Sequence, residues 1–174
     1  GDLKPNSTIE ELLVNRRSRR VVSESKLDLE EMCRILIFSA GRTHGELRAY
    51  PSAGARYPIE IYLIVLNVDS MDPGIYHYCP SDNSIEFLWL GDYTEQVSST
   101  LGFDVNDFVN DARVLIIMSS IDDRTTVKYG IEGNDFPLIE SGYVGANIML
   151  LCEERGLNSV AIGTQWWVEK IAEI

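Results

Sequence analysis

Hydrophobic and polar positions along the chain follow two different periods, and these periods predict a mixed series of helices and strands. Residues 28–40 carry apolar side chains at helical spacing, and Gly41 follows as a helix stop. Residues 60–68 alternate or run apolar, as a buried strand does. By the same criteria we expect helices after Ser7 or Thr8 and over 93–101, 105–110 and 136–155, and strands over 75–78, 85–89, 112–119 and 159–163.

The predicted strands set the fold class. Residues 114–118 read Val-Leu-Ile-Ile-Met without a polar break, which predicts a fully buried strand. The strands at 75–78 and 85–89 flank a Pro-Ser-Asp-Asn turn at 80–83, which predicts a hairpin and therefore antiparallel pairing. Helices mixed with an antiparallel hairpin indicate an α+β fold.

Composition restricts the classes of function. The 174 residues suit one domain, taken as 1–174, and 45% of them are hydrophobic, which is enough for a core. No apolar run approaches the ~18 residues of a membrane span, and the polar start shows no signal peptide, so we expect a cytoplasmic protein without a membrane partner. A net charge of −12 argues against nucleic acid as a partner.

The cysteines and histidines give no sign of a disulfide frame or a metal site. Cys33, Cys79 and Cys152 are widely spaced, which indicates reduced thiols, and the first and third fall on apolar helix faces that predict core positions. There is no Cys-x-x-Cys motif, and the two histidines are His44 and His77. We therefore expect no metal ion, and a structural role for His77.

Four arginines, at positions 16, 17, 19 and 20, surround Ser18 in a very acidic chain. Like charges repel, so this cluster needs an anion nearby. Guanidinium forks match phosphate oxygens, and Ser18 adds a hydroxyl, which points to a phosphate site. A solvated helix end is the structural alternative, since cations favour the C-terminal dipole.

The segment Pro-Ser-Ala-Gly-Ala-Arg-Tyr-Pro at 51–58 runs directly into the strand at 60–68. Small side chains at 52–55 allow backbone N–H groups to approach a flat ligand or a phosphate closely. Pro51 and Pro58 stiffen both ends of this loop. The alternative is an ordinary turn before a core strand.

Lys128 and Tyr129 form a pair of groups that can donate or accept protons, and burial can shift the pKa of each. Alone, such a pair is common. Asn106 is by default a helix cap, and Gly163 with Thr164 either ends a strand or presents backbone N–H groups to a ligand.

In order along the chain, these elements resemble the nitroreductase superfamily of FMN enzymes, and within it the SagB-type dehydrogenases, which are azoline oxidases. The resemblance spans nearly the whole chain and is carried by the arginine-serine box at 16–20, the small-residue loop at 51–62, Gly-Ile-Tyr-His-Tyr at 74–78, residues 106–112, Lys-Tyr-Gly at 128–130, the helix at 139–147 and residues 156–163.

The resemblance implies a central, mostly antiparallel mixed sheet flanked by helices, and a homodimer with FMN at the subunit interface. It implies that the FMN phosphate is held by Arg16, Arg17, Ser18 and Arg20, and that the flavin lies along Pro51, Ser52, Ala53 and Gly54 of the other subunit. It also implies a polar contact to the flavin from Asn106, backbone donors to flavin N5 and O4 at Gly163 and Thr164, and proton transfer by Lys128 and Tyr129. The chain stops at Ile174, before the last strand and the basic residues that complete the family's phosphate site, so we expect the C-terminal end of the family fold to be missing, either by trimming or because this is a short member.

The expected function is therefore an FMN-dependent oxidoreductase that moves hydride between flavin N5 and a small molecule or a modified peptide. Two alternatives stay open. One is a generic nitro or quinone reductase that takes its electrons from NAD(P)H. The other is a degenerate, non-catalytic scaffold subunit, because the SagB-type pattern continues with arginines where this chain has Glu132 and Asp135.

Overall fold

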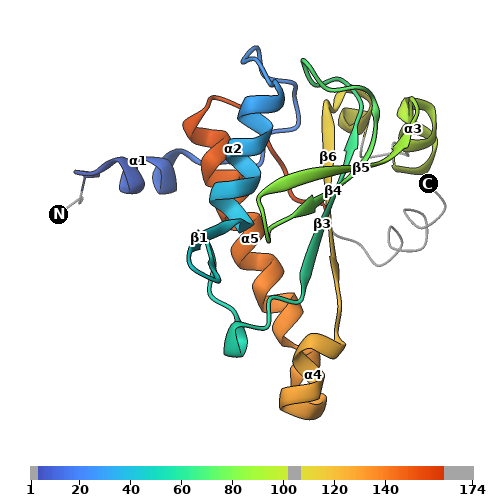
Figure 1. Cartoon of the computed structure of the whole chain (residues 1–174). Helices are drawn as coiled ribbons and strands as arrows, with labels where there is room; N and C mark the ends of the chain where they lie inside the picture. Colours follow the sequence, from blue (N-terminus) through green and yellow to red (C-terminus); the bar gives the residue numbers. More distant parts are fainter. Residues whose placement is uncertain (1–3, 102–106, 163–174) are drawn as a thin grey trace.

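The computed structural model describes residues 4–101 and 107–162. Its centre is a four-stranded antiparallel sheet in the order β5 (Ser84–Leu90), β4 (Gly74–Cys79), β3 (Ile59–Val65) and β6 (Val114–Ser120). Helices α2 (Leu29–Ala40) and α5 (Phe136–Glu154) lie side by side next to the sheet (Figure 1). The α+β prediction is confirmed, and so is the hairpin β4–β5.

The helices predicted after Ser7 and over 28–40, 93–101 and 136–155 form, whereas the segment expected as a helix over 105–110 is, from residue 107 on, a short 3-10 helix. The Ser7 hydroxyl accepts the Glu10 N–H at the start of α1 (Thr8–Asn15). The Asp28 carboxylate accepts the Glu31 N–H at the start of α2, 3.0 Å away. The remaining elements are short: β1 (Arg42–His44), β2 (Leu47–Arg48), η1 (Ala53–Ala55), α3 (Thr94–Leu101), η2 (Asp107–Asp111), α4 (Asp123–Tyr129) and η3 (Gly130–Asn134).

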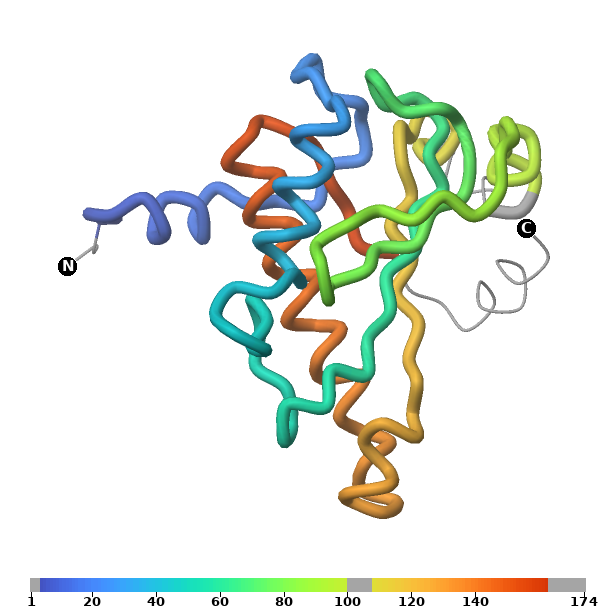
Figure 2. The backbone as a smooth tube through the Cα atoms, viewed as in Figure 1, coloured from blue at the N-terminus to red at the C-terminus, as the bar shows by residue number. Residues whose placement is uncertain are grey.

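Two apolar clusters cover the two faces of the sheet, because alternate residues of β3 point to opposite sides. Ile61 and Leu63 belong to the larger cluster, with residues of α2 and α5 such as Leu36 and Val144. Ile64 belongs to the smaller cluster, which α3 and η2 complete. The backbone trace shows α3 and η2 at the opposite side of the sheet from α2 and α5 (Figure 2).

Strand β6 departs from the prediction of full burial. Residues 114–117 are half-buried, and Met118 is 37% exposed. The reason is topological: within the described chain β6 pairs only with β3, so it forms an edge of the sheet. An unbroken apolar run does not distinguish an edge strand from a central one.

Two other segments differ from the sequence predictions. The described part of the expected strand at 159–163 has no strand pairing, although the Ser159 carbonyl accepts the Arg19 N–H at 3.1 Å. Helix α4 was not predicted, since its β-branched residues have low helix propensity. Residues 42–48 contain the short β1–β2 pair, which was not predicted, and Cys33, expected in the core, is only half-buried.

None of the helices in the described ranges combines the length and the apolar character that a membrane crossing requires.

Candidate functional site

The small-residue loop before β3 has unusual backbone geometry. Gly54 has φ of 60°, and Ala55 and Tyr57 have φ of 54° and 46° although neither is glycine. Left-handed backbone at a residue with a Cβ costs on the order of 1–2 kcal/mol, so neighbouring contacts must hold the loop in place.

A buried carboxylate supplies one of these contacts. Glu140 of α5 is 2% exposed, and its Oε1 accepts the Ser52 hydroxyl at 2.9 Å and the Ala53 N–H at 3.2 Å. The Ser52 Oγ in turn accepts the Tyr57 N–H at 2.8 Å. Burial raises the pKa of Glu140, and the two hydrogen bonds from the loop oppose that rise. The loop is therefore fastened to the first turns of α5.

Two buried oxygens beside the loop have no hydrogen-bond partner among the described residues: the second carboxylate oxygen of Glu140 and the Tyr50 hydroxyl. Burial also raises the pKa of Tyr50, to about 12. Sequence reasoning did not single out Glu140. Its spacing could have identified it, because Glu140, Val144 and Ile148 recur every four residues and therefore share one face of α5. This spacing places a carboxylate on the buried face of the helix.

Lys128 and Tyr129 lie directly against the same loop. A Cβ added at Gly54 would come within 2.5 Å of Lys128 Nζ and 2.6 Å of the Tyr129 hydroxyl. Two further hydrogen bonds join the loop to α4: Arg56 Nε donates to the Arg124 carbonyl, and Arg124 donates to the Tyr57 carbonyl at 2.9 Å. The structure thus brings the loop at Gly54 into contact with Lys128, which is 74 positions further along the chain. Because Gly54 has no Cβ, the ends of the Lys128 and Tyr129 side chains occupy the space that a side chain at position 54 would take.

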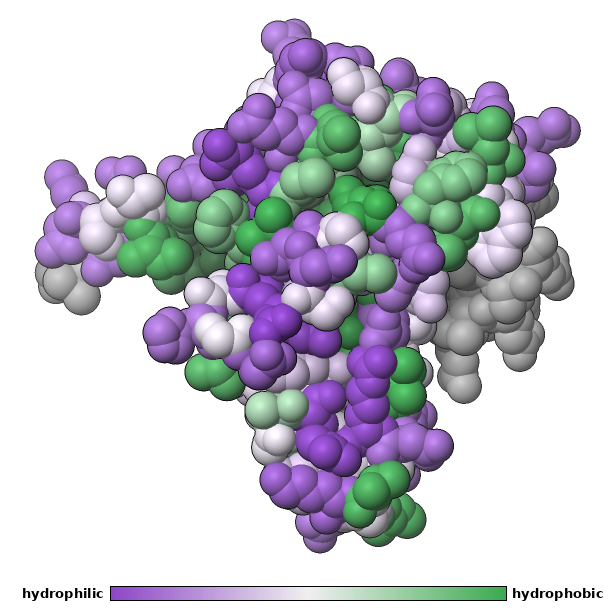
Figure 3. All heavy atoms as spheres, in the orientation of Figure 1, coloured by the Kyte–Doolittle hydropathy of each residue, from purple (hydrophilic) through white to green (hydrophobic). Residues whose placement is uncertain are grey.

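Several exposed apolar side chains lie at this end of the molecule, among polar ones. Those of α4, η3 and the start of α5 are well exposed, and hydrophobic surface is visible at the lower end over α4 (Figure 3). The members are Val127, Ile131, Leu138, Ile139 and Tyr143, here called the apolar end patch. Large exposed apolar side chains gathered at one end of a molecule are candidates for an interaction surface.

The arginine box follows α1 as an extended segment. Arg19 forms an ion pair with Glu153 of α5, so its charge is balanced within the chain, and the pKa of Glu153 is lowered by that contact. Arg17 donates to the Val14 and Arg16 carbonyls, and the Arg20 guanidinium lies 5.8 Å from the centre of the Phe108 ring. Within the described residues, Arg16, Arg17 and Arg20 have no carboxylate within ion-pairing distance.

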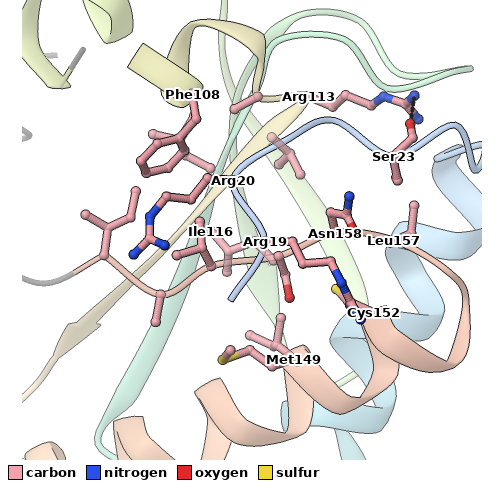
Figure 4. Close-up of a pocket in the computed structure, with 18 of the residues that line it drawn as sticks. Arg19, Arg20, Ser23, Phe108, Arg113, Ile116, Met149, Cys152, Leu157 and Asn158 are labelled. Atoms are coloured by element: carbon pink, nitrogen blue, oxygen red, sulfur yellow. Dashed lines mark hydrogen bonds between the residues drawn. The ribbon is translucent and has the colours of Figure 1, made fainter. Parts of the chain in front are cut away.

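A cavity of about 490 Å³ opens beside this box. It lies between residues 19–23, β6, one face of α5 and residues 157–162, and Figure 4 shows Arg19 and Arg20 at its wall with Phe108 and Met149. The Arg113 guanidinium donates to the Ser23 and Ser25 carbonyls and so fixes the wall. The cavity has the size and the mainly apolar lining of a cofactor pocket.

Helix α5 connects the cavity to the loop. Ser141 and Gly145 line the cavity, while the neighbouring Glu140 accepts hydrogen bonds from Ser52 and Ala53 of the loop. None of residues 51–58, all of which are described, lines the cavity. Of the predicted site residues, the structure therefore unites the loop with Lys128 and Tyr129, and it places Arg20 at a separate cavity. The predicted phosphate ligands Arg16, Arg17 and Ser18 do not line that cavity. Asn106, Gly163 and Thr164 lie outside the described residues.

Comparison with known proteins gives consistent matches. The sequence model of the nitroreductase family matches residues 13–165. The putative nitroreductase MJ1384 of Methanocaldococcus jannaschii is 33% identical over 169 residues, covering 95% of this chain and 83% of that protein. The microcin B17-processing protein McbC of Escherichia coli is 27% identical over 142 residues, covering 78% of this chain and 52% of McbC, so the chain spans about half the length of that relative.

Solved structures agree on the fold. A chain of the Escherichia coli microcin synthetase McbBCD complex, with truncated pro-MccB17 bound, superposes with a TM-score of 0.68 at 19% identity. The match covers 99% of this chain and 68% of that chain. At this identity the likeness speaks for the fold alone.

Proposed function

The chain belongs to the nitroreductase family, and from that membership and the geometry above we propose that it is an FMN-dependent oxidoreductase. The observation that carries the proposal is the cavity beside the arginine box, linked through α5 to the glycine loop and the Lys128–Tyr129 pair. The chemistry that FMN supplies when bound is hydride exchange at flavin N5 with an organic substrate.

The residues present fit the cofactor. A phosphate carries about −1.5 to −2 charge near neutral pH, and of the predicted phosphate ligands Arg20 lines the cavity and forms no ion pair with a described carboxylate. Arg16, Arg17 and Ser18 do not line the cavity, so their contacts to the phosphate stay predictions. The apolar walls from β6 and α5 suit a flat ring system, and the cavity volume of about 490 Å³ lies in the range of cofactor pockets.

Lys128 and Tyr129 would hold or accept a proton beside the loop. Both side chains are anchored at their bases by α4, and the Tyr129 ring packs edge-on against Phe136 with 5.0 Å between ring centres. Their polar ends converge at Gly54, so a substrate atom near this glycine would meet both groups. Asn106, Gly163 and Thr164 stay predictions for further contacts to the flavin.

We further propose that two copies of the chain complete the site. Within one chain the loop and the cavity share no lining residue, which suits a loop that reaches the cofactor of a second subunit. The apolar end patch lies on α4, η3 and α5, of which α4 and α5 hold the loop, and such pairing would bury it. Leu138 at 74% exposure and Ile131 at 85% have no described neighbour that shields them.

Two classes of substrate are consistent with the relatives. McbC is by name a microcin-processing protein, and its likeness favours a modified peptide, oxidised in the manner of a SagB-type dehydrogenase. MJ1384 is more similar and bears the name of a nitroreductase, which favours a small nitro or quinone compound reduced with NAD(P)H. The peptide proposal is the one that uses the Lys128–Tyr129 pair.

The test is turnover by FMN-loaded protein. Oxidation of an azoline-containing peptide with oxygen as acceptor supports the dehydrogenase proposal. Turnover of NADPH with a quinone, without azoline oxidation, selects the reductase. Protein that dimerises, binds FMN weakly or not at all and turns over neither substrate class selects the non-catalytic subunit.

A further inference from the structure

A cluster of metal-ligating side chains lies on the face of the sheet opposite α2 and α5. His77 and Cys79 are two positions apart on β4 and so point to the same side, and Glu86 of β5 is the direct cross-strand partner of His77. The His77 ring stacks on Tyr62 of β3 with 4.8 Å between ring centres, which places both on this face. The spacing of two along β4 and the β4–β5 register together assemble the group.

We propose that His77, Cys79 and Glu86 form a binding site for Zn²⁺, with a fourth position open to solvent. This proposal departs from the expectation of no metal site. It does not depend on the proposed oxidoreductase function.

The ligand atoms are close to the spacing that zinc requires. His77 Nδ1 lies 3.4 Å from Cys79 Sγ and 3.9 Å from Glu86 Oε2, and the Cys79 sulfur lies 3.9 Å from the same oxygen. Zinc–ligand bonds of about 2.0–2.3 Å in a tetrahedral site put ligand atoms about 3.3–3.7 Å apart. A small inward movement of the Glu86 side chain, which is 62% exposed, closes the difference.

The far side of the imidazole is already arranged for metal binding. His77 Nε2 lies 2.7 Å from Glu60 Oε2, and a carboxylate only accepts, so Nε2 carries the hydrogen and Nδ1 presents its lone pair to Cys79 and Glu86. Glu60 is itself paired with Arg124 through its other oxygen. Such carboxylate–histidine pairs orient the ring in many zinc sites.

Charge also favours a divalent cation. A Cys79 thiolate and the Glu86 carboxylate together balance the two positive charges of Zn²⁺, while Glu60 and Arg124 balance each other. A nitrogen, sulfur and oxygen set suits zinc better than magnesium or calcium, which prefer oxygen ligands. Three protein ligands with one open position are typical of zinc sites that keep a bound water.

Cobalt substitution and zinc competition test the proposal directly. The full chain is stripped with a chelator and then titrated with Co²⁺, which reports a thiolate ligand by a sulfur-to-metal charge-transfer band and a tetrahedral site by intense visible bands. Zn²⁺ affinity is measured by competition with a chromophoric chelator. We expect one ion per chain and an affinity that rises about tenfold per pH unit while Cys79 is protonated in the metal-free protein, because one proton leaves as the ion binds.

Matched variants separate this site from surface binding. Cys79→Ser and Glu86→Gln should each weaken Zn²⁺ binding at least tenfold, whereas Cys33→Ser removes a half-buried thiol outside the cluster and should not. Glu86 is exposed, so its variant is not expected to unfold the chain. Absence of the charge-transfer band, or equal Zn²⁺ affinity in the parent protein and Cys79→Ser, would overturn the proposal.

Discussion

Substituting Gly54 by alanine tests whether the loop and the Lys128–Tyr129 pair act as one unit. The new Cβ would lie 2.5 Å from Lys128 Nζ and 2.6 Å from the Tyr129 hydroxyl, both too close for unbonded atoms. Lys128 is exposed and can move aside at small cost. The Tyr129 ring is half-buried against Phe136, so moving it sacrifices an aromatic contact of about 0.5–1.5 kcal/mol.

Backbone strain adds to this cost and can be measured separately. Gly54 has φ of 60°, where an alanine costs about 1–2 kcal/mol. Gly45 provides a matched control, because it has φ of 58° and nothing within 4 Å of its added Cβ. We therefore expect Gly45→Ala to lower the free energy of unfolding by about 1–2 kcal/mol, and Gly54→Ala to lower it by about 1 kcal/mol more.

Urea unfolding and thermal melting give the stability of both variants, and substrate turnover by FMN-loaded protein gives the function. For a chain of this size, the loss of about 1–2 kcal/mol in Gly45→Ala corresponds to a fall in Tm of about 2–8 °C, and the loss of about 2–3 kcal/mol in Gly54→Ala to a fall of about 4–12 °C. Turnover should fall in Gly54→Ala and stay close to the parent value in Gly45→Ala. If both variants lose equal stability and keep equal turnover, the contact between the loop and the Lys–Tyr pair has no role.

Four further changes have defined outcomes. Lys128→Ala should keep bound flavin, read from its absorbance, and lose substrate oxidation; unchanged oxidation removes this lysine from the mechanism. Arg20→Ala should weaken FMN binding by about 10–100-fold, since a charged hydrogen bond contributes about 1.5–3 kcal/mol, whereas Arg34→Ala, at an exposed pair on α2, should not. Burial raises the pKa of Glu140, so the folded chain keeps the carboxyl proton to higher pH than the unfolded chain. The free energy of unfolding of the parent, relative to that of Glu140→Gln, should therefore be greatest below about pH 4.5 and fall as pH rises. A stability difference that grows with pH in urea titrations contradicts this. Leu138→Glu should leave the fold intact and shift the chain from dimer to monomer in sedimentation; a parent chain that is already monomeric contradicts the proposed pairing.

Local signals in the sequence predicted most of the elements. Helical spacing and the caps at Ser7, Asp28 and Gly41 place α1 and α2, and the turn at 80–83 places the β4–β5 hairpin. Helix caps, helical spacing and turns depend on residues that are close together in the chain, so a single sequence is enough to predict them.

Features that depend on contacts between residues far apart in the chain could not be predicted from the sequence alone. An apolar run does not reveal that β6 forms an edge of the sheet. The β-branched residues of α4 disfavour a helix, and α4 forms because its contacts with the loop and with η3 stabilise it. The loop and the Lys128–Tyr129 pair were found as separate motifs, but their meeting at Gly54 required the fold. The hairpin around the turn at 80–83 was predicted, but the register that sets His77 directly opposite Glu86 was seen only in the fold.

The amount of flavin bound per protomer tests the central claim most directly. Purified protein is incubated with FMN, freed of excess cofactor, and its flavin absorbance is compared with its protein concentration, while melting is followed with and without FMN. We predict close to one FMN per protomer, and at an FMN concentration of 100 times Kd a stabilisation of about 2.7 kcal/mol. Colourless protein whose Tm does not change on adding FMN would contradict the account.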